Sequence, residues 1–251
     1  MIEHAILLSA GQGSRLLPLT AERPKCLIDF SGRSLIAWQI EMLARAGVKK
    51  IDVVTGFMTD MLEDHLRSIS DPRVDISIRF NPFYKVADNL GSCWIARVAM
   101  HGDFMILNGD TLVSEEIVHK VQAGAAGPDG QPWPITVTVD VKAEGYDSDD
   151  MKVEREADGR LVHIGKTLTA AQSNAESIGF LAFRGEGAAL FRETVRQAMR
   201  TPEGVQHWYL KVIDSIAPTG KVGTVSIEGL DWAEVDFLND IEIATRLTDT
   251  W

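Results

Sequence analysis

Short apolar runs alternate with helically spaced segments along the first 110 residues, and this alternation limits the fold more than any other feature of the sequence. The first run, at residues 5–9, leads into a loop that contains Gly11 and Gly13. Strands that alternate with helices at such intervals pair in parallel through right-handed crossovers. We expect strands at 5–9, 51–55, 74–80 and 104–107, and helices at 35–46, 58–66 and 92–100.

The second half of the chain has a different pattern, with a strand-turn-strand segment typical of a hairpin. The loop GPDGQPWP at 127–134 is the best internal boundary, but it is too short for a flexible linker. We therefore predict a single α/β domain over residues 1–251, with halves at 1–126 and 127–251. Its sheet is mostly parallel and flanked by helices, and the smaller second half contains antiparallel strands. Expected strands lie at 135–141, 152–156, 161–164, 177–183 and 222–227, and expected helices at 187–199, 205–216 and 237–247.

The charge balance excludes several kinds of partner. The chain has 25 Lys and Arg against 36 Asp and Glu, a net charge of −11, which disfavours binding of nucleic acid over a broad face. No window approaches 18 apolar residues, so we expect no membrane span, and the first residues do not resemble a signal peptide. Two cysteines, Cys26 and Cys93, fit a reducing compartment, and a cytoplasmic location is expected. Whether the chain forms a homo-oligomer stays open.

The most informative stretch is LSAGQGSRLLPLTAERPKCL, residues 8–27. Gly11 and Gly13 allow backbone N–H groups to turn inward and form a concave site for anionic oxygens. Arg15 adds a planar set of donors, and Pro24-Lys25 brings a second cation to the same loop. Together these groups suit the triphosphate of a nucleotide, whereas a plain glycine-rich turn beside a surface arginine is the simpler alternative.

Two other phosphate-binding motifs do not fit. The dinucleotide fingerprint needs a third glycine where Leu16 stands. A P-loop needs a glycine five residues before Gly165-Lys166-Thr167, where Arg160 stands instead. The sequence therefore disfavours a dinucleotide-binding loop at residues 8–27 and a P-loop at residues 160–167.

Residues 8–27 resemble the signature of the sugar-phosphate nucleotidyltransferase family, which reads G-x-G-x-R, then P-L-T, then P-K. The resemblance implies a nucleotide-binding half at 1–126 and an acceptor-binding half at 127–251. Five further segments resemble the branch of that family that uses CTP to activate phosphocholine, aminoethylphosphonate, inositol phosphate and related acceptors. These segments are Asn81-Pro82, residues 88–92 (DNLGS), residues 147–153 (DSDDMKV), Gly165-Lys166 and residues 232–236 (WAEVD).

In this family a hard cation neutralises charge on the reacting phosphates, and Mg²⁺ is usually held by one or two carboxylates. Asp110 follows an expected strand, and Asp236 ends the WAEVD segment. Both match the metal-binding aspartates of the family, and Glu234 is an additional candidate on the same strand face. The alternatives are a turn aspartate at 110 and a helix N-cap at 236.

The resemblance also assigns roles to other side chains. Arg15, Lys25 and Lys152 are the expected catalytic cations, where Lys25 contacts the α-phosphate and Arg15 the leaving pyrophosphate. Lys152, Lys166 and Glu176 face the acceptor, although each fits a solvated surface residue as well. The expected nucleotide contacts are Ala10, Gly11, Gly13, Arg15, Lys25, Asn81, Asn89 and Ser92; for the asparagines, turn formation is the alternative.

Residues 144–158 hold seven acidic against two basic side chains. Such a stretch is usually a solvated loop, but it also suits a cationic acceptor. The predicted reaction transfers CMP from CTP to a small phosphorylated or phosphonate acceptor with Mg²⁺. A sugar-1-phosphate uridylyl- or thymidylyltransferase is the alternative enzyme, and a non-catalytic nucleotide-sensing subunit is the alternative from another class.

Overall fold

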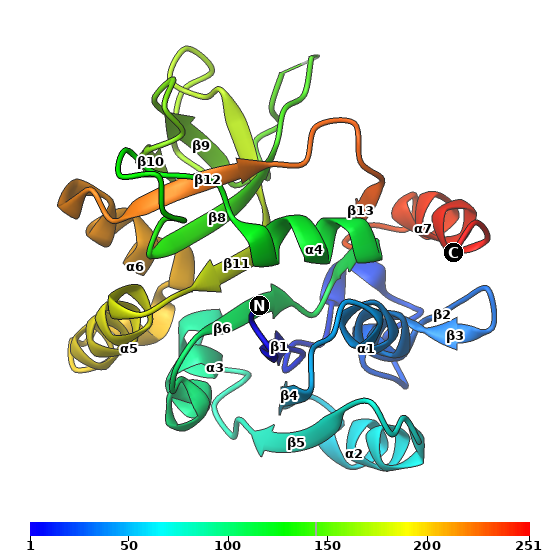
Figure 1. The fold of residues 1–251 in the computed structure, drawn as a ribbon. Helices are drawn as coiled ribbons and strands as arrows, with labels where there is room; N and C mark the ends of the chain where they lie inside the picture. The colour runs from blue at the N-terminus through cyan, green and yellow to red at the C-terminus, as the bar shows by residue number, and fades with distance from the viewer. Residues whose placement is uncertain (144) are drawn as a thin grey trace.

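A computed structural model describes residues 1–143 and 145–251, so that Glu144 of the acidic stretch lies outside the described residues. Its centre is a nine-stranded sheet that runs through both halves of the chain (Figure 1). In the first half the strands are parallel, in the order β6-β1-β4-β5; they are β1 His4–Leu8, β4 Lys50–Thr55, β5 Asp75–Phe80 and β6 Phe104–Asn108.

The second half joins this sheet through β11 (Ala175–Phe183), which is antiparallel to β6. β8 is antiparallel to β11 in turn, and therefore β8 and β12 run in the same direction as β6. The remaining strands of the sheet are β8 Ile135–Asp140, β9 Lys152–Arg155, β10 Leu161–Ile164 and β12 Val222–Ser226. The predicted α/β class is confirmed, and so are the parallel first half and the hairpin.

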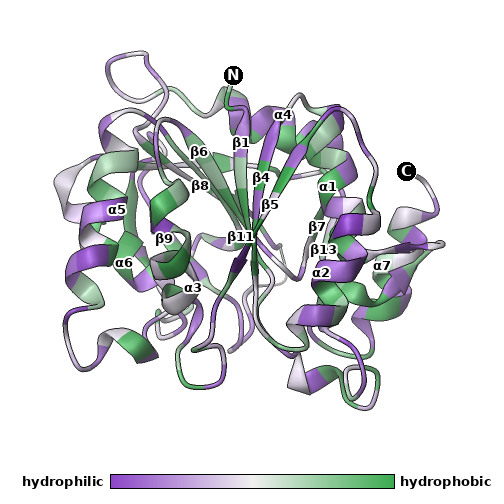
Figure 2. Ribbon diagram, turned by 90° about the horizontal axis from the view of Figure 1, so that it is seen from below, coloured by the Kyte–Doolittle hydropathy of each residue, from purple (hydrophilic) through white to green (hydrophobic). Residues whose placement is uncertain are grey.

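Helices cover both faces of the sheet, and each face has its own apolar core (Figure 2). Along β1, Ala5 and Leu7 face one core while Ile6 and Leu8 face the other, because successive side chains of a strand point to opposite faces. This explains the uninterrupted apolar runs of the first half. One face carries α1 Leu35–Arg45, α2 Thr59–Ser68, α4 Glu115–Ala123 and α7 Asp240–Thr248; the other carries α3 Asn89–Ala96, α5 Glu186–Ala198 and α6 Tyr209–Ile216.

A short two-stranded ladder outside the main sheet positions Asp110 and Asp236, which precede or follow its strands. β7 (Thr111–Val113) pairs with β13 (Trp232–Glu234), and the Val235 N–H donates to the Asp110 carbonyl at 2.9 Å. Residues more than 120 positions apart are thereby held side by side. A second small pair joins β2 (Asp29–Phe30) and β3 (Arg33–Ser34).

Several helix boundaries differ from the expectation. The segment 205–216 contains a 3₁₀ turn and then α6, because the Asn89 side chain accepts the Tyr209 N–H at 2.9 Å and caps the later start. The segment 237–247 becomes helical only at Asp240, whose carboxylate accepts the N–H groups of Asp236 and Phe237. Asp236 is therefore not the N-cap. Helix α4, capped by Ser114, was not expected.

Within the part of the chain that the structure describes, no helix is long and apolar enough to cross a membrane.

Candidate active site

The functional side chains gather at one edge of the sheet. Because β1, β4, β5 and β6 are parallel, their carboxyl ends meet there and bring together the glycine loop, Asn81 and Asp110. Two cavities open at this edge, one of about 190 Å³ and one of about 860 Å³. The smaller is lined by the glycine loop and the larger mainly by the second half. They share four lining residues, which are Asp88, Asn89, Asn108 and Asp110.

The glycine loop packs closely against Lys25. Gly13 has a φ of +73°, and a Cβ there would lie 2.8 Å from Cβ of Lys25. The Thr20 hydroxyl donates to the Gly13 carbonyl at 2.9 Å and holds the turn. On the next strand, a Cβ at Gly109 would lie 2.5 Å from the Leu8 carbonyl oxygen, so the backbone around Asp110 is equally confined.

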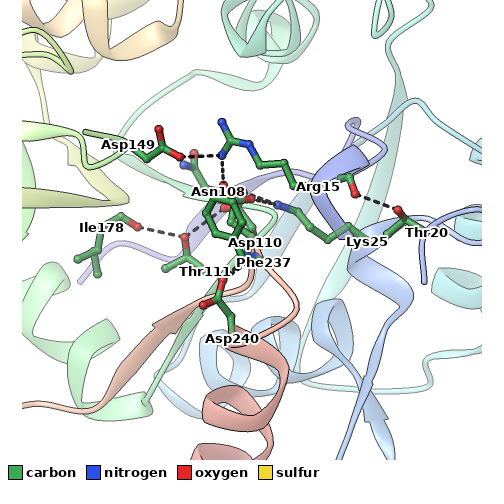
Figure 3. A network of polar contacts seen from close by, with 12 residues as sticks. Arg15, Thr20, Lys25, Asn108, Asp110, Thr111, Asp149, Ile178, Phe237 and Asp240 are labelled. Atoms are coloured by element: carbon green, nitrogen blue, oxygen red, sulfur yellow. Dashed lines mark hydrogen bonds and ion pairs between the residues drawn. The ribbon is translucent and has the colours of Figure 1, made fainter. Parts of the chain in front are cut away.

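Two cations of the loop contact two carboxylates from distant parts of the chain (Figure 3). Lys25 Nζ donates to Asp110 Oδ2 at 2.8 Å and to Asp236 Oδ1 at 2.7 Å. Arg15 Nη1 donates to the other oxygen of Asp236 at 2.8 Å and lies 3.8 Å from Asp149. Burial opposes the charge on Lys25, but the two carboxylates outweigh it and raise its pKa above the usual value. Lys25 is therefore a fixed cation.

The same carboxylates provide a donor set that suits a divalent cation. Hard oxygen ligands fit Mg²⁺, which needs only one or two carboxylates beside substrate phosphates. Among the described residues no group of three or more His, Cys, Asp or Glu side chains is arranged to hold a metal ion, so Asp110 and Asp236 stand as a pair. Glu234 faces the larger cavity, where desolvation and the charges of Asp110 and Asp236 raise its pKa to about 8. Its metal role stays a prediction.

The residues expected to contact the base lie in the smaller cavity. Asn81 and Ser92 are buried, and Asn81 Nδ2 donates to Ser92 Oγ at 3.1 Å. The side-chain Oδ1 of Asn81 also accepts the Phe83 N–H, and Oδ1 of Asn89 accepts the Tyr209 N–H. Asn81 therefore organises a local turn and Asn89 caps the start of α6, while their contact with a base stays a prediction.

The three residues expected at the acceptor have different surroundings. Glu176 and Lys166 line the larger cavity, and the Lys166 ammonium lies 5.2 Å from the centre of the Trp208 ring. Lys152 is 6% exposed and donates to the carbonyls of Lys166 at 3.1 Å and Ser148 at 3.4 Å. It does not line either cavity, so a contact between Lys152 and the acceptor requires its side chain to leave these carbonyls.

Sequence reasoning missed Lys142. Its ammonium lies 2.7 Å from Glu176 Oε2 and 3.0 Å from Asp150 Oδ2, and all three residues line the larger cavity. Lys142 follows β8, which runs in the same direction as β6, so it stands at the same edge of the sheet as Asp110. A charged residue directly after a strictly alternating strand was the signal that could have identified it.

Residues 4–146, more than half of the chain, match the family described as Nucleotidyl transferase. A CTP:phosphoglutamine cytidylyltransferase of Campylobacter jejuni is 24% identical, and the match covers 96% of this chain and 98% of that protein. The CMP-5'-(3-aminopropyl)phosphonate synthase of Streptomyces rubellomurinus is 28% identical over 93% of this chain but only 37% of its own length.

A solved structure shares the whole fold. The inositol-1-phosphate CTP transferase of T. maritima has a TM-score of 0.77 and 19% identity, and the match covers 99% of this chain and 97% of that one. Together with the family match, the glycine loop and the paired lysine and aspartates identify the chain as a nucleotidyltransferase that belongs to the nucleotidyl transferase family.

Proposed function

We propose that this enzyme transfers CMP from CTP to a small phosphorylated or phosphonate acceptor and releases pyrophosphate. The observation that carries the proposal is the position of Lys25 between Asp110 and Asp236, where the two cavities meet. A triphosphate in the glycine loop would place its α-phosphate at that border. The names of two relatives refer to CTP or CMP, which favours CTP as the donor.

The reaction needs one bond formed and one broken. An acceptor oxygen attacks the α-phosphorus of CTP, and the bond from that phosphorus to the bridging oxygen of the β-phosphate breaks as pyrophosphate leaves. A phosphate monoester has a second pKa near ~6, so its oxygen is already deprotonated at pH 7 and no general base is required. Positioning and charge stabilisation then supply the catalysis.

The residues divide these tasks between them. The ammonium of Lys25 contacts the α-phosphate while its stem stays packed on Gly13. Arg15 steadies the pyrophosphate, and the backbone of Gly11 and Gly13 receives phosphate oxygens. Asp110 and Asp236 would hold Mg²⁺, which supplies charge neutralisation at the phosphates. Asn81, Asn89 and Ser92 would contact the cytosine, and Ala10 would contribute backbone atoms.

The test is pyrophosphate release with ATP, CTP, GTP, UTP and dTTP against a panel of phosphorylated acceptors. We expect turnover to be highest with CTP and to require Mg²⁺. Preference for UTP or dTTP with glucose-1-phosphate would favour the sugar-nucleotide alternative. Folded protein that releases no pyrophosphate with any pair would contradict the proposal.

A further inference from the structure

The larger cavity contains a lysine clamped between two carboxylates at a place that the proposed reaction does not use. Lys142 Nζ pairs with Glu176 Oε2 at 2.7 Å and with Asp150 Oδ2 at 3.0 Å. Burial opposes the charge of Lys142, but both carboxylates outweigh it and raise its pKa. The geometry shows that these two carboxylates can hold an ammonium group.

The pairing leaves one strong acceptor atom unused. Glu176 is 3% exposed and lines the cavity, and among the described residues no hydrogen-bond partner reaches its Oε1. A buried polar atom without a partner destabilises the folded protein because it has lost its hydrogen bonds to water. A ligand that brings one more N–H donor to Glu176 would relieve that destabilisation.

The wall of the larger cavity around Glu176 also suits a cation. Of the described residues, ten Asp and Glu side chains line the cavity against two lysines, Lys142 and Lys166. The Trp232 indole N–H donates to Asp140 at 2.9 Å, which holds its ring in the wall, and Asp140 is the cross-strand neighbour of Glu176. The purely anionic end of an acceptor would be repelled here, whereas an ammonium would be attracted.

We propose that Glu176 and Asp150 form a seat for a protonated amine of the acceptor, which displaces the ammonium of Lys142. This inference rests on the proposed function and names its acceptor class: a phosphate or phosphonate with an N–H-bearing ammonium at the other end. A trimethylammonium group has no N–H to donate to Oε1 of Glu176, so it fits this seat less well than a primary amine.

Displacement of Lys142 would also free its ammonium to bind the anionic end of the acceptor. The Lys142 side chain is 37% exposed, and among the described residues its ammonium pairs with these two carboxylates, so it can swing while its backbone stays at the end of β8. The displaced ammonium can then pair with the anionic end of the acceptor, which otherwise faces a strongly acidic wall. Lys142 thus becomes a positioning residue that responds to the amine.

The seat is tested with three acceptors that share one anionic end: aminoethylphosphonate, trimethylammonioethylphosphonate and propylphosphonate. Binding is measured by isothermal titration calorimetry and kcat/KM by pyrophosphate release with CTP and Mg²⁺. We expect aminoethylphosphonate to bind at least about tenfold more tightly than the other two, which corresponds to ~1.4 kcal/mol. Equal binding of all three would overturn the seat.

Two variants and a matched control locate the effect. Glu176→Gln should reduce the preference for the amine to within about twofold, whereas the exposed Glu228→Gln should preserve it. Lys142→Met should bind the amine at least as tightly as the parent protein but lower kcat, because the anionic end loses its partner. Amine preference that survives in Glu176→Gln, with the fold verified by circular dichroism, would overturn the proposal.

The calorimetric measurement of acceptor binding separates the proposed reaction from the proposed amine seat at Glu176 and Asp150. If no acceptor is turned over but the amine preference in binding is present, the seat stands and the reaction is wrong. If turnover occurs without preference for the amine, the reaction stands and the seat is wrong.

Discussion

Two lysines in opposite halves of the molecule have the same local arrangement, an ammonium between two carboxylates, but they differ in how they are held. Lys25 has a 12% exposed side chain, and its stem packs on Gly13, where no Cβ would fit. Lys142 is 37% exposed, and within the part of the chain that the structure describes its ammonium is held by the ion pairs with Glu176 and Asp150. The first is a rigid part of the proposed nucleotide site, while the second is the side chain that we propose to exchange with a ligand cation.

The largest expected effect concerns the rigid lysine's partner. Asp110→Asn should lower kcat for pyrophosphate release on the order of 10³-fold, because it removes a charge from the proposed metal pair and from Lys25. The matched control is Asp75→Asn, an exposed residue at the start of β5, which should keep full activity. Undiminished turnover in Asp110→Asn would contradict the assignment of Asp110 as a ligand of Mg²⁺.

Removal of the rigid cation itself should have two opposite effects. Lys25→Met should lower kcat about 10²-fold, since a donor to the reacting phosphate is lost. It should also strengthen the binding of Mg²⁺ or Mn²⁺ to nucleotide-free protein, because Lys25 no longer competes for Asp110 and Asp236. Calorimetric titration of each metal measures this; unchanged metal affinity would show that the ion does not bind between those carboxylates.

Two glycine substitutions distinguish the effect of the contact between Lys25 and Gly13 from the effect of backbone strain. Gly13→Ala places a Cβ 2.8 Å from the Lys25 stem and adds left-handed strain of about 1–2 kcal/mol. Gly130→Ala has the same kind of strain, at a φ of +76°, but meets nothing within 4 Å. We expect both variants to lose stability in urea unfolding, Gly13→Ala at least as much as Gly130→Ala, and only Gly13→Ala to bind CTP about tenfold more weakly. Equal CTP affinity in both would refute a rigid Lys25.

On the acceptor side, the expected effect is a pH dependence of stability rather than a loss of activity. Burial raises the pKa of Glu176 to about 7 although Lys142 lowers it, and Asp150 adds to the increase; Asp140 and Tyr146 lie nearby. A carboxyl with a folded pKa above its usual 4.5 favours the folded state at low pH, and that stability is lost as the pH rises through about 7.

Unfolding in urea at several pH values measures this loss. Between pH 4.5 and 7 the free energy of unfolding of the parent protein should fall by up to about 3 kcal/mol relative to Glu176→Gln. Parallel stability curves for the two proteins would show that Glu176 titrates normally.

The sequence was most informative where a function depends on adjacent residues. The loop at residues 8–27 carries its glycines and cations within one short stretch, so its chemistry could be predicted without a fold. The apolar runs identified the strands of the main sheet because burial on both faces needs continuous apolar residues. Helix starts at Tyr209 and Asp240 were mispredicted, since capping by Asn89 and a local Asp240 turn decides them.

The sequence by itself determined the fold class, the position of the glycine loop and the cations within it, because these depend on periodicity and on adjacent residues. Only the tertiary structure decided which carboxylates those cations meet, through the β7–β13 ladder that brings Asp236 to Asp110. It alone also placed Lys142 between Glu176 and Asp150, since those three residues come from separate segments. Contacts between distant segments depend on strand direction and register, which no local pattern encodes.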